Sequence, residues 1–171
     1  MKPADRPLTL ERLREVLSYD SETGVLRWKV RQSRRNHVGD QAGTIAEDGY
    51  RVIQIDGWHY KAARLAWFYY YGRWPYPQAD HRDLDRDNNR IANLREATDS
   101  QNGANVGLLS TNKTGLKGVS MGSANRRKRW KAQIRKDGER RFLGYFETPE
   151  RAHAAYCAAA QQLHGEFART S

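Results

Sequence analysis

Cysteine is nearly absent from this 171-residue chain, and long hydrophobic runs are absent altogether. The single cysteine, Cys157, excludes an intrachain disulfide and a cysteine zinc cluster, and it fits a reducing compartment. No apolar stretch is long enough for a membrane span or for the core of a signal peptide. We therefore expect a cytoplasmic protein without a membrane partner.

Acidic residues are also in short supply, with 20 Asp and Glu against 30 Lys and Arg, a formal net charge of +10. The excess is uneven, because residues 115–171 hold 12 Lys and Arg against 5 Asp and Glu, whereas residues 1–114 hold 18 against 15. Taken alone, a charge run is also explained as a solvated surface. The imbalance favours a polyanion as the partner of the C-terminal part.

The most informative motif is Asp80-His81, followed by Asn93 and Asn102. Cutting a phosphodiester bond needs a base to deprotonate water and a cation to neutralise charge on the phosphate. An imidazole titrates near neutral pH, so His81 is the candidate base. A carboxylate and an amide carbonyl are hard oxygen ligands suited to a magnesium-type ion, which makes Asp80 and Asn102 the candidate ligands.

Local patterns predict how these residues are arranged. A strand carries Asp80 and His81, residues 83–90 are polar and turn-forming, and residues 93–96 are extended. Thr98 or Asp99 can then cap a helix that bears Asn102. Asn93 is expected to tie the intervening loop to the strand of His81 through side-chain bonds to the backbone.

Plainer explanations exist for the same residues. An Asp-His pair is commonly a surface ion pair, and asparagines commonly form turns. Asp83, Asp85 and Asp87 also alternate as in an EF-hand calcium loop. However, Asn88 stands where that loop needs its glycine, and Leu94 stands where it needs its bidentate glutamate, so calcium binding is disfavoured.

The motif, with the phrases Asp-Asn-Asn-Arg at 87–90 and Asn-Leu-Arg at 93–95, resembles the HNH endonucleases of the phage and homing-endonuclease-like branch. The resemblance implies His81 and Asn93 as catalytic residues, Asn93 in an orienting role, and a metal held by Asp80 and Asn102. It implies Mg²⁺ as the cofactor, with Mn²⁺ as the alternative, and no small-molecule cofactor. Such relatives commonly carry a histidine where this chain has Ala63, which leaves that histidine's role unfilled.

Further elements are expected before the motif. Residues 8–17 have helical spacing behind Thr9, and residues 25–29 form a strand. Asp56-Gly57 predicts a hairpin between residues 50–55 and 58–60. Residues 62–71 read as an aromatic-rich helix ended by Gly72, with its aromatic side chains mainly in the core.

The C-terminal part has three strand-like segments, 117–120, 129–135 and 141–146, before a helix opened by Thr148 and Pro149. Phrases such as Leu143-Gly144 resemble the APETALA/ethylene-response-factor-type DNA-binding domain, whose sheet enters the major groove. Alternation turns Trp130, Ala132 and Ile134 towards the helix and the intervening residues outwards. An arginine commonly reads bases at the position of Ser120, which weakens that part of the match. The predicted DNA-binding residues are Lys117, Arg126, Arg127, Arg129, Lys131, Gln133, Arg135 and Arg140.

The predicted fold class is α+β: an N-terminal ββα-metal nuclease unit with preceding hairpins and a helix, then a three-stranded antiparallel sheet packed on one helix. The expected domains are 1–109 (nuclease), 110–114 (linker) and 115–171 (DNA binding). The predicted function is a metal-dependent endonuclease on double-stranded DNA, a site-preferring nickase resembling homing endonucleases, monomeric and located in the bacterial cytoplasm if phage-encoded. The alternative is a non-catalytic DNA-binding or regulatory protein with a decayed nuclease unit.

Overall fold

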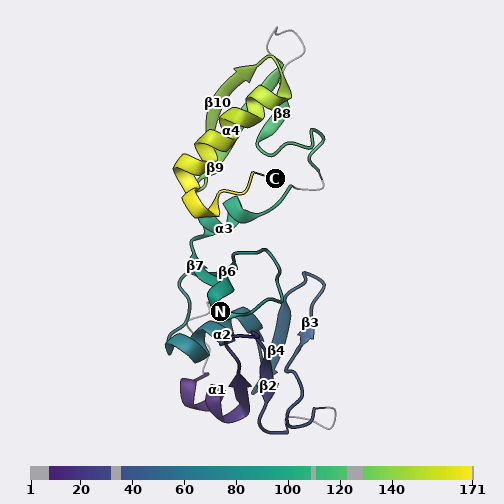
Figure 1. The fold of residues 1–171 in the computed structure, drawn as a ribbon, viewed down its shortest axis with the longest axis vertical. Helices are drawn as coiled ribbons and strands as arrows, with labels where there is room; N and C mark the ends of the chain where they lie inside the picture. The colour runs from purple at the N-terminus through teal and green to yellow at the C-terminus, as the bar shows by residue number, and fades with distance from the viewer. Residues whose placement is uncertain (1–7, 32–35, 109–110, 123–128, 171) are drawn as a thin grey trace. The chain divides into compact units, whose positions relative to one another are not determined.

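The computed structural model describes residues 8–31, 36–108, 111–122 and 129–170. Helices and small antiparallel sheets alternate along the chain, which confirms the α+β class (Figure 1). The fold divides into two compact units at Ala97/Thr98. None of the described helices is long and apolar enough to cross a membrane.

The first unit begins with a helix and a two-stranded ribbon. Thr9 caps α1 (Leu10–Val16) by accepting from Arg12 N at 3.2 Å, as expected. The ribbon pairs β1 (Leu17–Tyr19) with β2 (Leu26–Trp28). The sequence predicted the second of these strands and not the first, because β1 continues directly from the helix.

A three-stranded sheet and a helix complete the core of this unit. Its strands are β3 (Thr44–Ile45), β4 (Arg51–Ile55) and β5 (Trp58–Lys61). Asp56 (φ 48°) and Gly57 (φ 83°) make the predicted tight turn. The helix α2 (Ala62–Tyr71) ends at Gly72 with a left-handed cap, also as predicted.

The aromatic residues of α2 differ from the expectation in part. Trp67 and Phe68 are buried, but Tyr70 and Tyr71 are 53% and 48% exposed. A single helix face meets the core, and five consecutive aromatics cannot all lie on it. Ala63, at the position of the missing histidine, is buried in a cluster with Leu94, which directly follows Asn93.

The motif itself forms a hairpin at the end of the first unit. β6 (Gln78–His81) pairs antiparallel with β7 (Leu94–Ala97), and a 3₁₀ turn, η2 (Ile91–Asn93), precedes β7. The connecting residues 82–90, called here the 82–90 loop, contain turns and irregular backbone but no helix or strand. The predicted strand, polar loop and extended segment are thus confirmed.

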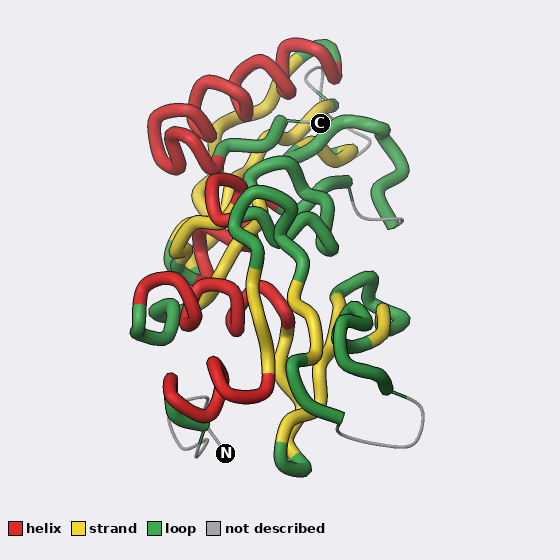
Figure 2. Tube along the Cα trace, turned by 60° about the horizontal axis from the view of Figure 1, so that its bottom comes forward, coloured by secondary structure: helices red, strands yellow, loops and turns green. Residues whose placement is uncertain are grey.

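The second unit starts with the short helix α3 and continues into the predicted sheet and helix. Figure 2 shows the long helix α4 running alongside the strands of this sheet. Ala132 and Ile134 of the sheet and Tyr156 of the helix are buried in the clusters between them. The strand order is β10-β9-β8, all antiparallel. The elements are α3 (Asp99–Asn105), β8 (Val119–Met121), β9 (Trp130–Lys136), β10 (Glu139–Phe146), α4 (Pro149–His164) and η3 (Gly165–Phe167).

Candidate active site

The β6–β7 hairpin carries Asp80 and His81 into the interior of the first unit. The register sets Asp80 opposite Arg95 and His81 opposite Leu94. Asp80 is 6% exposed and His81 is 4% exposed. Burial of two adjacent polar residues is unusual on a structural strand and is typical of a functional site.

Asp80 forms a buried ion pair with Arg95. Arg95 Nε donates to Asp80 Oδ2 at 2.9 Å, and each side chain is 7% exposed. Directly opposed residues of an antiparallel pair share a face, so the register itself brings the two charges together. The guanidinium compensates the carboxylate charge in an environment where an isolated charge is costly.

The hydrogen bonds of Asn89 assign the tautomer of His81. Asn89 Nδ2 donates to Asp87 O at 3.0 Å, which turns Asn89 Oδ1 towards His81 Nε2 at 3.2 Å. An amide oxygen only accepts, so His81 Nε2 carries the proton. In the neutral ring Nδ1 is therefore the basic nitrogen.

Asn93 ties the 82–90 loop together. Its Oδ1 accepts from Asp83 N at 3.1 Å, and its Nδ2 donates to Asn88 O at 2.8 Å and to Asp83 Oδ1 at 2.9 Å. Burial raises the pKa of Asp83, but the hydrogen bonds from Asn88 and Asn93 outweigh it and hold that pKa below its usual value. Asn93 thus makes side-chain bonds to the backbone that follows His81.

Other parts of the first unit hold the loop from outside. Arg51 of β4 makes a bidentate pair with Asp87, with both N–O distances at 2.8 Å. Tyr19 donates to Asn89 O at 2.7 Å. Gly24 (φ 76°) packs so closely on the backbone of Asn89 and Arg90 that a Cβ would collide with it. The loop that contacts His81 is therefore held by residues from several other segments of the first unit.

The β6–β7 hairpin lies in a segment that is similar to a known protein family. Residues 60–104 match the family model described as HNH endonuclease. This segment is thus similar to HNH endonucleases.

A curated relative agrees with this assignment. An uncharacterized HNH endonuclease of Acanthamoeba polyphaga mimivirus is 36% identical over 89 residues, which cover 52% of this chain and 44% of that protein. The match thus spans less than half of the relative's length. No solved structure matches the chain.

Asn102 is the one predicted residue of the HNH motif that lies in the second unit. It sits on α3, where its backbone N donates to Thr98 O at 2.9 Å. Thr98 and Gln101 form the capping box at the start of this helix, with bonds of 3.2 and 2.8 Å. The structure thus places Asn102 on the predicted helix, and its role as a metal ligand stays a prediction.

The donor chemistry of the HNH domain fits a hard divalent cation. Among the described residues no group of three or more His, Cys, Asp or Glu side chains could hold a metal, and the three aspartates of the 82–90 loop form no calcium site. Mg²⁺ commonly takes only one or two protein carboxylates and completes its shell with water and phosphate oxygens. The Asp80 carboxylate is a donor of this kind, and the assignment of Asp80 and Asn102 as ligands stays a prediction.

The predicted DNA-binding residues lie in different settings of the second unit. In the C-terminal sheet, Ala132 and Ile134 are buried as expected, and the intervening residues of β9 are not. Cross-strand pairs on the outer face are Arg135 with Arg140, Gln133 with Phe142, and Lys131 with Tyr145. Arg129 is exposed just before β9, and Arg126 and Arg127 lie outside the described residues.

Lys117 is not on this outer face. Its Nζ donates to Ala104 O and to Val106 O, both at 2.6 Å. Burial and the nearby Arg169 lower the pKa of Lys117 to about 8. The Lys117 ammonium is thus bonded to backbone carbonyls of its own unit, and its predicted contact with DNA stays a prediction.

Sequence reasoning missed Arg95 and Asn89 as parts of the candidate site. Both stand inside the phrases that carried the resemblance. Arginine is neither a metal ligand nor a general base at neutral pH, and Asn89 was interpreted only as part of a turn-forming loop. The pairing register could have identified Arg95, because a hairpin with His81 opposite Leu94 sets Arg95 opposite Asp80. Asn89 had no such signal, since its contact depends on the path of the 82–90 loop.

Proposed function

We propose that this protein is a metal-dependent DNA endonuclease that cuts with the HNH site of residues 80–102. The single observation that carries the proposal is the buried His81, held in one tautomer by Asn89 within a segment that matches the HNH family model. A buried imidazole with an assigned basic nitrogen is what general-base catalysis needs.

The proposed chemistry uses few groups. His81 Nδ1 accepts the proton of the attacking water, and Asn93 keeps the loop after His81 in place. Asp80 and Asn102 would hold a divalent ion, preferably Mg²⁺ with Mn²⁺ as the alternative, which neutralises charge on the phosphate and the leaving oxygen. The guanidinium of Arg95 fixes the Asp80 carboxylate while it is not engaged with a ligand.

The proposed substrate is double-stranded DNA, bound mainly by the C-terminal sheet. Arg135 and Arg140 are both exposed and stand directly opposite each other. Like charges in this arrangement repel, so an anion between or above them is stabilised. Together with the +7 charge of residues 115–171, this supports a domain of the APETALA/ethylene-response-factor type that reads the major groove.

One HNH site per chain makes a single-strand nick the expected product of one binding event. We propose a monomeric, site-preferring nickase of the homing-endonuclease-like kind. A monomer bound to a duplex presents its site to one strand, and the second strand requires a second event.

A specific observation favours a second candidate, a DNA-binding protein with a decayed nuclease unit. The carboxylate proposed as a metal ligand already has a buried cationic partner, Arg95. A cation built into the chain can replace the charge of a metal ion without replacing its chemistry.

Incubation of supercoiled plasmid with the purified protein separates the two candidates. The endonuclease proposal predicts nicked circles with Mg²⁺ or Mn²⁺ and none with excess chelator. Plasmid that is bound, as seen by gel shift, yet uncut with either metal would establish the decayed alternative. Linear product without a nicked intermediate would contradict the nickase and monomer proposals.

A further inference from the structure

The helix that bears Asn102 is too short to be stable by itself. α3 has seven residues, Asp-Ser-Gln-Asn-Gly-Ala-Asn, of which most have low helix propensity, and only Asn105 is buried. Isolated helices need roughly 12 to 15 residues even with favourable sequences. Contacts outside the helix must therefore hold it.

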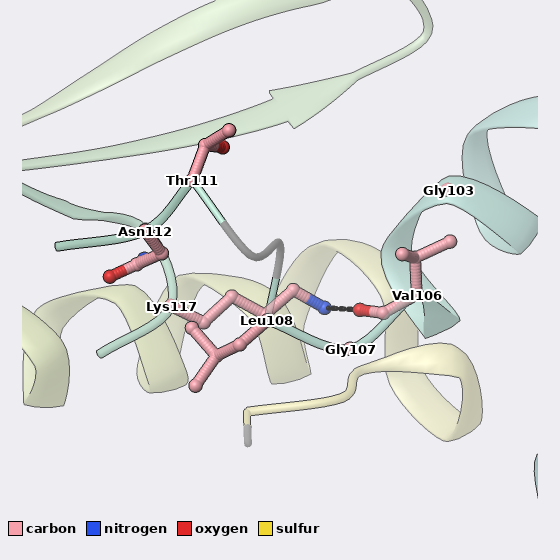
Figure 3. Close-up of a pocket in the computed structure, with 8 residues that line it drawn as sticks. Gly103, Val106, Gly107, Leu108, Thr111, Asn112 and Lys117 are labelled. Carbon is pink, nitrogen blue, oxygen red and sulfur yellow. Dashed lines mark hydrogen bonds between the residues drawn. The ribbon is translucent and has the colours of Figure 1, made fainter. Parts of the chain in front are cut away.

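Its C-terminal end is held by a lysine from the following loop. The last carbonyls of a helix lack partners within the helix. Lys117 Nζ donates to Ala104 O and Val106 O, as Figure 3 shows for the bond to Val106. A positive charge at this end is also favoured by the helix dipole. Lys117 thus does for the end of α3 what the Thr98 capping box does for its start.

Lys117 is itself fixed by the C-terminal helix. Its carbonyl O lies 3.1 Å from His153 Nδ1 of α4. Lys117 lines a pocket of about 410 Å³ together with Gly103 of α3 and Asn112 of the loop, among others. Arg169, near the end of the described chain, covers Gly107 so closely that a side chain there would be tight.

A second bond holds α3 from the sheet. Asp137 N, in the tight turn between β9 and β10, donates to Ser100 Oγ at 2.9 Å. Asp137 (φ 51°) and Gly138 (φ 86°) give this turn a defined geometry. The first and last turns of α3 are thus both bonded to the sheet-and-helix part that was predicted to serve DNA binding alone.

We propose that Lys117 is a positioning residue of the nuclease: its ammonium holds the last turn of α3, and so the Asn102 side chain, in the conformation that the active site requires. The inference rests on the proposed function. It gives the C-terminal part a role in the chemistry besides DNA binding, and it separates Lys117 from the phosphate contacts of the outer sheet face.

Amide hydrogen exchange of the full-length protein tests whether Lys117 holds α3, without any activity measurement. Lys117→Met removes the ammonium and keeps the apolar stem, and Lys113→Met removes a charge from the same loop at an exposed position. Loss of charged hydrogen bonds should raise exchange in residues 99–106 by about tenfold in Lys117→Met. Lys113→Met should leave it unchanged, and Lys117→Arg should restore most of the protection.

Ser100→Ala keeps the test decisive if Lys117→Met does not fold. It removes the acceptor of Asp137 N and should raise exchange in the same segment by about fivefold. If residues 99–106 exchange at the wild-type rate in both variants, the proposal that Lys117 holds α3 is overturned.

Nicking kinetics distinguish positioning from DNA contact. With plasmid at saturation, Lys117→Met should cut at least about tenfold more slowly and need more Mg²⁺ for half-maximal rate, with unchanged DNA affinity and salt dependence. A phosphate contact would instead weaken binding and reduce the salt slope by about one unit, with the saturated rate intact. That second outcome would overturn the inference, whereas a wild type that never nicks would refute the proposed function alone.

Discussion

At the scale of single residues, the site depends on how Asp80 is neutralised. Its carboxylate is almost fully buried, and Arg95 supplies the opposite charge on the same face of the hairpin. A buried pair contributes little net stability over an apolar pair, but removal of one partner leaves a charge that is costly to bury. The observed ion pair requires the Arg95 guanidinium next to Asp80, whereas the proposed metal binding places a second cation at the same carboxylate.

Arg95→Met is expected to destabilise the first unit by about 3–5 kcal/mol, because the Asp80 carboxylate loses its guanidinium partner. Urea unfolding measures the loss. The matched control is Arg73→Met, which breaks the pair of Arg73 with Glu96 on the same strand; there the arginine is 57% exposed and the loss should stay within about 1 kcal/mol.

If Asp80 also binds a divalent ion, Mg²⁺ should raise the unfolding temperature of Arg95→Met more than that of the wild type. Equal losses in the two arginine variants would show that the burial of Asp80 does not depend on this pair.

At the scale of elements, the 82–90 loop is held by packing that the motif does not contain. Asn93 ties it from within, and Arg51, Tyr19 and Gly24 hold it from other parts of the unit. A loop whose backbone is fixed at several points can keep a general base in one orientation.

Gly24→Ala should therefore impair catalysis although Gly24 is far from His81 in sequence. Both Gly24 and Gly39 have positive φ, so an alanine strains the backbone at either position. Of the two, only the Cβ at Gly24 also meets the backbone of the 82–90 loop, whereas the Cβ at Gly39 meets no atom of the described residues within 4 Å.

We expect nicking to fall by about 10²-fold in Gly24→Ala, since small misplacements of a catalytic group have effects of that order. Gly39→Ala should nick like the wild type. Similar rates for the two variants would mean that contact between Gly24 and the loop does not orient His81.

Most elements could be predicted from the sequence because their signals are local. Thr9, Asp56-Gly57, Gly72 and Thr148-Pro149 each act through neighbouring backbone, and the corresponding caps and turns are present. Contacts between distant segments were not predictable in this way. The bonds of Asn89 to His81 and of Lys117 to α3 depend on the path of irregular chain, which no periodicity encodes.

At the scale of the whole molecule, the chain forms two compact units whose boundary precedes α3. The sequence suggested that a nuclease domain ends at 109 and that a linker follows at 110–114; that division of function stays a prediction. The contacts of α3 with Lys117 and Asp137 nevertheless join the Asn102 helix to the C-terminal part in structure.

Deletion of residues 115–171 is therefore expected to abolish cutting as well as to weaken DNA binding. The sequence alone predicts that the truncated chain still cuts at high enzyme concentration, because the four motif residues remain. The truncated chain keeps the Thr98 capping box but loses Lys117, which holds the end of α3, and Asp137, which bonds to Ser100, so high concentration should not rescue it.

The control for this deletion is Arg135→Met in the full chain. It should weaken binding by about 1–3 kcal/mol if Arg135 contacts a base edge, yet keep the saturated nicking rate. Efficient cutting by the truncated chain would instead confine the nuclease to residues 1–114.

The most direct test of the account measures the single-turnover nicking rate and the DNA affinity of His81→Ala together. General-base catalysis by His81 predicts a rate lower by about 10² to 10⁴, with a DNA dissociation constant within about twofold of the wild type. His37→Ala, at a 70% exposed histidine of the same unit, should change neither quantity. A His81→Ala protein that nicks at the wild-type rate would contradict the proposed active site.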